Sequence, residues 1–303
     1  MLRRRFIKDS SLLALGITAC GQISWREGKF VADSPTSTDI LGPFYRPGAP
    51  FRTNLNPPGF SGKLLHLSGT VYKDDAKTVI PGCLLEIWQC EANGLYDNVS
   101  DDYRYRAAQK TSARGTYQFT TTIPIPYPTD PKTPQVMRPA HIHMRVAAAG
   151  QQDLITQIYL QGDPYLAEDP STKSPLCAAR ILPVTQRGNN EYHIQFNLVL
   201  QKEYLPSDSV FARVSGVYKM SDGSTMEFYR NADLLFYKTN GQIWGGLGYA
   251  GNNSFTGGVN DTEAHFEWLL DGQVRVRFQF IRRRKLMLDG EKLFNYPSPT
   301  VAG

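Results

Sequence analysis

The chain has 303 residues, of which 41% are hydrophobic, 12% aromatic and 20% charged, a composition typical of a globular protein with a sizeable core and two domains. The 26 glycines and 20 prolines, with many tyrosines, threonines and valines, favour strands and turns over long helices. The formal charge is +5, but residues 1–19 contribute +3 (four basic residues against one acidic), so residues 20–303 carry about +2 and give no reason to expect a nucleic-acid partner.

The first twenty residues predict an export signal. The basic head Arg3 to Lys8 precedes an apolar stretch from Ser10 to Ala19, which is about half of the ~20 residues that a membrane-spanning helix needs. The order Arg-Arg-x-Phe-Ile-Lys resembles the twin-arginine signal, which exports folded proteins. Because residues 17–20 resemble a bacterial lipobox, we expect lipidation of Cys20 and a membrane-anchored lipoprotein on the periplasmic side. An ordinary amphipathic N-terminal helix is the alternative.

After the signal, residues 21–38 are polar and without periodicity, which favours a linker. Residues 39–204 predict one β-rich domain, in which glycine- and proline-rich loops separate the strands. The expected strands are 64–73, 83–89, 116–122, 141–148, 154–160 and 191–200.

Residues 205–303 predict a second, smaller β-rich domain. Turn signals recur at Ser221-Asp222-Gly223, Asn240-Gly241 and Asp271-Gly272, which favours a meander or a half-barrel. The basic run 282–285 is interpreted as a solvated turn or edge, with a contact to anionic lipid as the alternative. The aromatic content of the domain suits a lid, an oligomer interface or a polyphenol-binding surface, and the sequence does not rank these three.

Cys83 and Cys90 lie at opposite ends of one predicted strand, roughly 23 Å apart at ~3.3 Å per residue, so they cannot bond to each other. A disulfide from Cys177 to one of them and three unpaired thiols are both open.

Two of the five histidines, His141 and His143, are two residues apart in a predicted strand. Both imidazoles therefore lie on one face, opposite the apolar side chains of Ile142 and Met144. Two neutral nitrogen donors side by side are half of a metal site. The other three histidines share their strand faces with polar residues and are expected to face solvent: His66, His193 and His265.

Two tyrosines are candidates for the other half of the site, because a hard ferric ion prefers oxygen anions such as tyrosinate. Tyr96 follows a predicted strand and an Asn93-Gly94 turn, which directs it back over the end of the sheet. Tyr127 lies between two prolines that restrict its backbone. A zinc hydrolase that uses the histidine pair, with both tyrosines incidental, is the alternative enzyme.

Taken together, these segments resemble the intradiol ring-cleavage dioxygenases, the family of protocatechuate and catechol dioxygenases. The resemblance covers residues 39–202, and no single motif carries it alone. Five segments match in order: 42–50, 86–96, 115–128, 138–143 and 154–164.

The resemblance implies a β-sandwich with its site among loops at one edge, a catechol-type substrate, O2 and a ring cut between its hydroxyls to a cis,cis-muconate-type product. It implies that Arg138 and Gln157 lie beside the substrate and that Tyr127 leaves the metal and takes up a proton as substrate binds. Pro43 and Tyr45 are expected at the substrate pocket. The implied non-haem Fe(III) ligands are Tyr96, Tyr127, His141 and His143.

Two features depart from the family. Leu41 stands where an acidic residue is common, and the helical dimerisation segment of the catechol-type members is missing, so the oligomeric state is open. A non-enzymatic alternative is an exported β-sandwich binding lipoprotein without catalysis. The sequence does not name the substrate and leaves catechol, protocatechuate, hydroxyquinol and larger plant phenols open.

Overall fold

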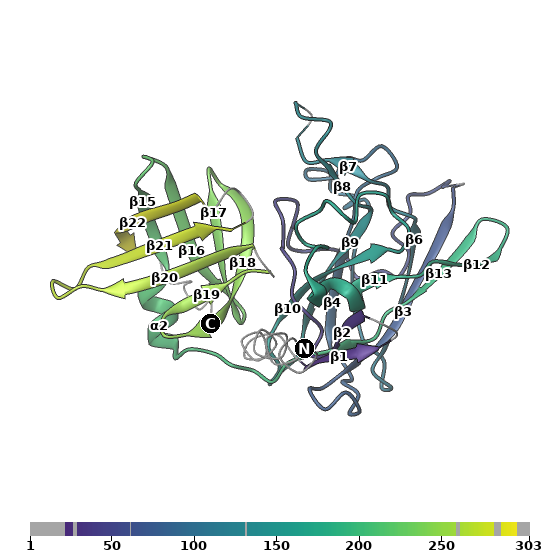
Figure 1. Cartoon of the computed structure of the whole chain (residues 1–303), viewed down its shortest axis with the longest axis horizontal. Helices are drawn as coiled ribbons and strands as arrows, with labels where there is room; N and C mark the ends of the chain where they lie inside the picture. The colour runs from purple at the N-terminus through teal and green to yellow at the C-terminus, as the bar shows by residue number, and fades with distance from the viewer. Residues whose placement is uncertain are drawn as a thin grey trace, which may run out of the picture.

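The computed structural model describes residues 22–26, 29–60, 62–130, 132–258, 261–281 and 286–295. The predicted signal with Cys20 and the basic run 282–285 lie outside the described residues. Among the described residues, every helix is too short or too polar to cross a membrane. Figure 1 shows two β-rich units, of which the C-terminal one, in green and yellow, is a barrel.

An antiparallel hairpin lies within the segment predicted as a linker. Its strands are β1 (Gln22–Arg26) and β2 (Lys29–Ser34), paired from Gln22↔Ser34 to Arg26↔Lys29. Strands this short pair through their backbones without needing a long alternating pattern, so hydrophobic periodicity does not reveal them.

The larger unit contains two five-stranded sheets. In the first sheet the order is β11-β10-β9-β4-β5, and in the second it is β12-β13-β3-β14 with β6 also paired to β3. The first sheet comprises β4 (Leu84–Trp88), β5 (Arg106–Lys110), β9 (His141–Ala147), β10 (Leu154–Leu160) and β11 (Ile181–Leu182). The second comprises β3 (Leu64–Tyr72), β6 (Thr116–Thr122), β12 (Thr185–Gly188), β13 (Glu191–Gln195) and β14 (Leu198–Val199).

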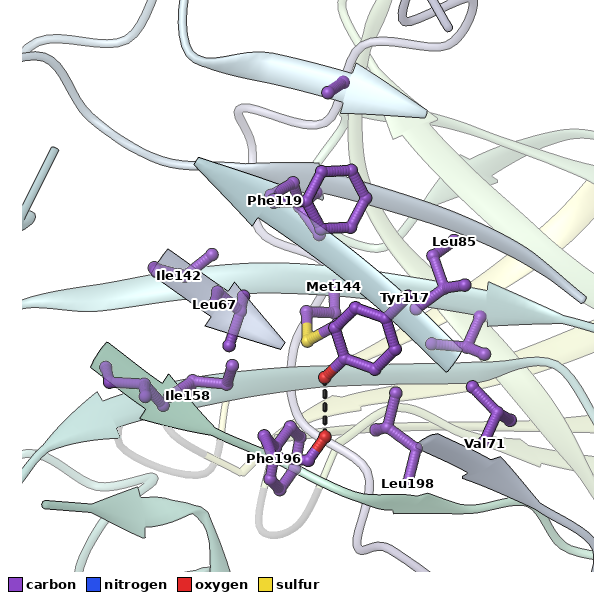
Figure 2. Packing of buried hydrophobic residues seen from close by; sticks show 14 of the residues in the cluster. Leu67, Val71, Leu85, Tyr117, Phe119, Ile142, Met144, Ile158, Phe196 and Leu198 are labelled. Carbon is purple, nitrogen blue, oxygen red and sulfur yellow. Dashed lines mark hydrogen bonds between the residues drawn. The ribbon is translucent and has the colours of Figure 1, made fainter. Parts of the chain in front are cut away.

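One hydrophobic core joins the two sheets (Figure 2). Ile142 and Met144 of β9 point into it with Phe119 of β6, and Tyr117 Oη donates a hydrogen bond to the Phe196 carbonyl at 2.6 Å. Because side chains alternate along a strand, the odd-numbered residues of β9 lie on the opposite face of the first sheet. That outer face carries the two histidines.

Each strand predicted for this unit corresponds to observed strands, but β5, β11 and β12 were not predicted. The sequence of β5, Arg-Ala-Ala-Gln-Lys, contains no β-branched or aromatic residue, which explains why this strand was not expected. The predicted strand 191–200 is divided into β13 and β14, which both pair in parallel with β3.

The C-terminal unit is a closed barrel of eight antiparallel strands in meander order, entered through α2 (Asp208–Val214). The predicted half-barrel is wrong, because the barrel is closed: its last strand, β22, pairs with its first, β15, from Gly216↔Asn295 to Met220↔Gly290. Aromatic rings such as Phe228, Phe266 and Phe278 fill its core. The strands are β15 (Gly216–Met220), β16 (Thr225–Asn231), β17 (Leu234–Thr239), β18 (Gln242–Gly251), β19 (Ser254–Thr256), β20 (Thr262–Trp268), β21 (Val274–Phe280) and β22 (Leu286–Asn295).

Candidate metal centre

The two imidazoles of β9 point at each other, with 3.1 Å between the Nε2 atoms of His141 and His143. Both side chains are buried. His141 Nδ1 lies 2.7 Å from the Pro139 carbonyl, to which it donates, and this hydrogen bond fixes the tautomer in which Nε2, the atom a metal would bind, carries the lone pair. Burial and the neighbouring His141 hold the pKa of His143 well below its usual range, so this ring is neutral, as a ligand must be.

Trp88 supports His143 from β4. The two residues are directly paired across the strands, and their rings stack at 4.9 Å with an interplanar angle of 9°. The stacking leaves the imidazole little freedom to rotate. Trp88 was not predicted as a site residue, because alternation in one strand does not give its register against the next.

The phenol oxygens of Tyr96 and Tyr127 meet these nitrogens. Tyr96 Oη lies 3.4 Å from Tyr127 Oη and 3.4 Å from His141 Nε2, and Tyr127 Oη lies 3.3 Å from His141 Nε2. The structure thus brings together the four residues that the resemblance singled out.

Two local features place the tyrosines. Gly94 turns the chain after β4 with φ +80°, and a Cβ there would lie 3.2 Å from the Cβ of Tyr127, so a larger residue would crowd the second tyrosine. Tyr127 itself opens β7 (Tyr127–Pro128), which pairs with β8 (Met137–Arg138). In that pairing Tyr127 lies directly opposite Arg138.

The four atoms fit a single metal ion. Ligands bound at about 2.0–2.1 Å in a tetrahedral arrangement lie ~3.3 Å from one another. His141 Nε2 lies 3.1–3.4 Å from the other three donor atoms, and the two phenol oxygens lie 3.4 Å apart. Burial raises the pKa of both Tyr96 and Tyr127 above the ordinary phenol value, so each keeps its proton until a cation replaces it. Two phenolates and two imidazoles form a donor set suited to ferric iron.

Arg138 is held beside this centre by three hydrogen bonds. Its Nε donates to Asp169 Oδ2 at 2.7 Å, and its Nη2 donates to Gln157 Oε1 and Tyr159 Oη, each at 3.0 Å. Asp169 lies 31 residues after Arg138 in the sequence, and neither Asp169 nor Tyr159 was predicted as a site residue. Tyr159 lies on the same face of β10 as Gln157, so the alternation of side chains along this strand could have predicted it as a site residue.

The register of β10 against β9 explains this arrangement, because Gln157 pairs with His143 and Tyr159 with His141. Behind them Asp39 accepts hydrogen bonds from Tyr159 Oη at 2.8 Å and from Arg180 Nη1. The outer face of the first sheet is therefore a buried polar network, which fixes the guanidinium of Arg138.

The segment 41–45 covers the centre. Phe44, which was not predicted, stacks on Tyr96 with 4.3 Å between ring centroids. Tyr45 is 7% exposed and donates to Glu86 Oε2 at 2.9 Å, so it packs behind the centre, whereas Pro43 is half-buried at its edge.

Known proteins resemble this part of the chain. The family model described as Dioxygenase matches residues 40–202. The chlorocatechol 1,2-dioxygenase of Rhodococcus opacus is 32% identical over 210 residues, 61% of this chain and 77% of that protein. The intradiol ring-cleavage dioxygenase prcA of Aspergillus niger is 30% identical over 214 residues, 63% of this chain and 67% of that protein.

Among solved structures, the wild-type catechol 1,2-dioxygenase of Acinetobacter radioresistens matches with a TM-score of 0.51 and 28% identity, over 58% of this chain and 66% of that one. The family match ends at residue 202, before α2 and the barrel begin. All four candidate ligands, Arg138 and Gln157 lie within the matched residues.

Proposed function

The chain belongs to the dioxygenase family, whose model spans residues 40–202, and is an intradiol ring-cleavage enzyme; on this premise we propose that it acts on a catechol-type substrate with O2 through a non-haem Fe(III) centre. The proposal depends on one observation, the convergence of two phenol oxygens and the His143 nitrogen on His141 Nε2, at 3.1–3.4 Å. In a zinc hydrolase or a binding lipoprotein this convergence would have no role.

The ligands proposed for the iron are Tyr96, Tyr127, His141 and His143. When bound, ferric iron would bind the substrate through its hydroxyl oxygens and draw electron density from the ring, which prepares a ring carbon for O2. The protein contributes a rigid donor set, since His141 is fixed by the Pro139 carbonyl and His143 by the Trp88 ring.

Tyr127 is the proposed base. Burial raises the pKa of its phenol, so once away from a cation it keeps a proton taken from a substrate hydroxyl. Its Oη is hydrogen-bonded to Tyr96 Oη, so the proton stays inside the buried site. Departure of Tyr127 as the substrate binds would also make room for a substrate oxygen at the centre.

Arg138 is proposed to stabilise negative charge that develops near the ring. Its Nε and Nη2 are occupied by Asp169, Gln157 and Tyr159, whereas its Nη1 has no hydrogen-bond partner among the described residues. A fixed charge of this kind contributes about 2–4 kcal/mol to a transition state. Gln157 acts by holding Arg138, because its own amide donates to the Ile40 carbonyl at 2.8 Å.

The segment 41–45 forms a wall of the proposed substrate pocket. Pro43 and Phe44 are proposed to contact a bound ring, whereas Tyr45, which is hydrogen-bonded to Glu86 and Arg145, is proposed to support them from behind. A cis,cis-muconate-type diacid is the proposed product, and simple catechols are the first substrates to test, because relatives are named for catechol and chlorocatechol.

The test is oxygen consumption by iron-loaded protein with a panel of catechols, with identification of the products. Ferric tyrosinate is expected to give a broad visible band, and cleavage between the hydroxyls converts both hydroxyl-bearing carbons to carboxyl groups. An aldehyde product from cleavage beside the hydroxyls, or a colourless iron-loaded protein, would contradict the proposal.

The N-terminal segment supports a second, separate proposal: residues 1–20 direct export, and Cys20 is lipidated. On this proposal the lipid anchors the protein on the periplasmic side of a membrane. Residues 21–38 link the anchor to the catalytic domain (39–204), which the accessory domain (205–303) follows. Growth with a radiolabelled fatty acid is expected to label the protein and not its Cys20→Ser variant. Equal labelling of the two would rule this out.

A further inference from the structure

The C-terminal barrel packs against the same outer face that carries the metal centre. Arg145 lies two residues after His143 on β9 and on the same face. Its Nη1 donates to Tyr45 Oη at 3.0 Å, and its Nη2 donates to Asp153 Oδ2 at 2.9 Å and to Asn231 Oδ1 of the barrel at 2.8 Å. One strand therefore supplies both imidazoles and an anchor for the barrel.

A chain of aromatic rings runs from the barrel to a ligand. Phe236 of β17 meets Tyr45 edge-on at 5.8 Å, Tyr45 meets Trp88 at 5.0 Å, and Trp88 stacks on His143 at 4.9 Å. All four are buried, and the first three belong to one hydrophobic cluster shared by both units. Interiors are close-packed, so the position of the barrel restrains these rings.

The barrel also reaches the segment 41–45 directly. Gln242 Nε2, at the start of β18, donates to the Pro43 carbonyl at 3.0 Å. On one side of Pro43, Gly42 has φ +77° and approaches His143 so closely that a Cβ would lie 3.3 Å from its Cε1. On the other side, Phe44 stacks on Tyr96. The hydrogen bond thus holds the middle of a segment whose neighbours contact two proposed ligands.

We propose that the barrel is a working part of the active site: strands β17 and β18 hold residues 41–45 against the metal centre and thereby set how tightly, and which, catecholic rings bind. This rests on the proposed function. Gln242 and Phe236 are positioning residues, since neither contacts a ligand atom. The barrel acts through its outer surface, because aromatic side chains fill its interior.

The decisive variant is Gln242→Glu in the full iron-loaded chain, which replaces the donor with a carboxylate that repels the Pro43 carbonyl. Loss of one net hydrogen bond is expected to raise KM for catechol about fivefold and to change the ranking of substituted catechols. The value of kcat is expected to stay within about twofold and the visible band to be unchanged. Gln273→Glu, an equally exposed glutamine in another barrel turn, is the matched control.

A merely structural role for Gln242 would lower the melting temperature of the barrel and leave KM and substrate ranking as in Gln273→Glu; that result overturns the proposal. Phe236→Leu, which keeps an apolar side chain and removes the ring, is expected to raise KM in the same direction. If KM is unchanged in both Gln242→Glu and Phe236→Leu, the proposal is overturned as well.

Hydrogen exchange separates this proposal from the proposed function, because it needs no turnover. Peptides covering residues 39–46 are expected to exchange faster in Gln242→Glu than in Gln273→Glu. If wild-type protein shows neither a visible band nor turnover, the proposed function fails. In that case equal exchange in the two variants would overturn the barrel proposal as well, and faster exchange in Gln242→Glu would support only its first part, that the barrel holds residues 41–45.

Independent of the barrel, a cluster on the second sheet has the donors of a metal site. His66 of β3 and His193 of β13 are directly paired, and their rings stack at 4.8 Å. Glu191 lies two residues before His193 on the same face, and one ligand atom from each of the three lies within 4.8 Å of the others. Thr120 Oγ1 is 3.3 Å from His66 Nδ1 and so orients that ring.

We infer that His66, His193 and Glu191 bind a divalent transition metal such as Zn²⁺, at a site separate from the tyrosine-containing centre. The residues flanking His66, Leu65 and Leu67, are in the core between the sheets, so His66 lies on the outer face of the second sheet. The three atoms need to approach to ~3.3 Å, which rotation of the two half-buried imidazoles and the exposed Glu191 side chain allows.

Calorimetric titration of Zn²⁺ into iron-loaded full-length protein is the test, with the visible band recorded throughout. One zinc per chain with micromolar affinity is expected, weakened at least about tenfold by His193→Gln and unchanged by His265→Gln. Equal binding by His193→Gln, no heat at ~100 µM zinc, or a band that falls as zinc replaces the iron would each overturn the inference.

Discussion

Two regions of the molecule, the outer face of the first sheet and the interior of the barrel, bury opposite kinds of side chain. On the outer face of the first sheet many buried groups are polar, and Arg138 donates hydrogen bonds to Gln157, Tyr159 and Asp169. Inside the barrel the buried groups are aromatic rings that contact edge to face. A hydrogen-bonded network fixes the positions of individual atoms, whereas an apolar core mainly fixes shape and stability. Substitutions in the first region should therefore change chemistry, and those in the second should change stability.

The largest effect on chemistry is expected from Tyr127→Phe, which removes a proposed ligand and base. Turnover should fall about 10⁴-fold, equivalent to about 5 kcal/mol, and a large part of the visible band should be lost. Stopped-flow kinetics and absorption spectra of iron-loaded protein measure both.

Tyr117→Phe is the matched control for that substitution, because it removes a buried hydroxyl from the opposite face, inside the core between the sheets. It should lower the unfolding free energy by about 1–3 kcal/mol, since the Phe196 carbonyl loses its donor, and leave the band intact. If both variants kept full colour and turnover, Tyr127 would not be a ligand.

The largest effect on stability is expected from Phe228→Ala in the barrel. Phe228 is fully buried and contacts the rings of Tyr218 and Phe266, each at 5.3 Å. The cavity should cost about 3–5 kcal/mol of unfolding free energy, seen in denaturant titration. Below the barrel transition the visible band should keep its position, because no proposed ligand comes from the barrel. Loss of the band at native temperature would show that the two regions are not separable.

The sequence indicated the four converging residues better than it indicated the residues around them. The four proposed ligands are recognisable because each lies in a locally distinctive context, such as the His141-Ile142-His143 alternation or the prolines around Tyr127. Their support depends on strand register and on contacts between distant segments. Trp88 faces His143 only through the pairing of β4 with β9, and Asp169 reaches Arg138 from a loop.

The same limit applies to the barrel. Its turns can be predicted from Asn-Gly and Asp-Gly pairs. Closure of the barrel, however, depends on the pairing of β22 with β15, about 70 residues earlier in the chain, and local sequence patterns do not predict that pairing. The contact of Gln242 with Pro43 joins residues 199 positions apart. An exposed glutamine near a turn has no signature that distinguishes it from any other.

The pH dependence of iron binding tests the polar region directly. Burial raises the pKa of Tyr96 and Tyr127, so both phenols are protonated in the metal-free protein at neutral pH, whereas His143, with its lowered pKa, is already neutral. Binding should therefore release two protons, and affinity should fall about 100-fold (about 2.7 kcal/mol) for each pH unit downward.

Competition with a chelator of known proton affinity, between about pH 6 and pH 8, measures this slope. Tyr127→Phe, with one phenol left to deprotonate, should reduce it to about tenfold per pH unit. An affinity that does not change with pH in the wild-type protein would mean that the phenols are not ligands.

The smallest of these effects concerns Asp169→Asn. The Asp169 carboxylate accepts from Arg138 Nε at 2.7 Å and from the Ser171 amide at 2.8 Å. An asparagine side chain has only one oxygen, so one of the two donors loses its acceptor whichever way the amide is turned. Because Arg138 is buried, kcat should fall by about 10–30-fold, about 2 kcal/mol, with the visible band unchanged.

Asp289→Asn in the barrel is the matched control, because Asp289 also pairs with an arginine, Arg277 at 3.3 Å, but both side chains are more than half exposed. Exposed pairs contribute little, so this variant should change neither kcat nor the unfolding free energy by more than about 0.5 kcal/mol. A fall in kcat confined to Asp169→Asn, together with the unchanged band, identifies a positioning role, since general destabilisation would weaken the band as well. Equal effects of the two substitutions would mean that the orientation of Arg138 does not matter for the reaction, and that the buried network serves stability as the barrel core does.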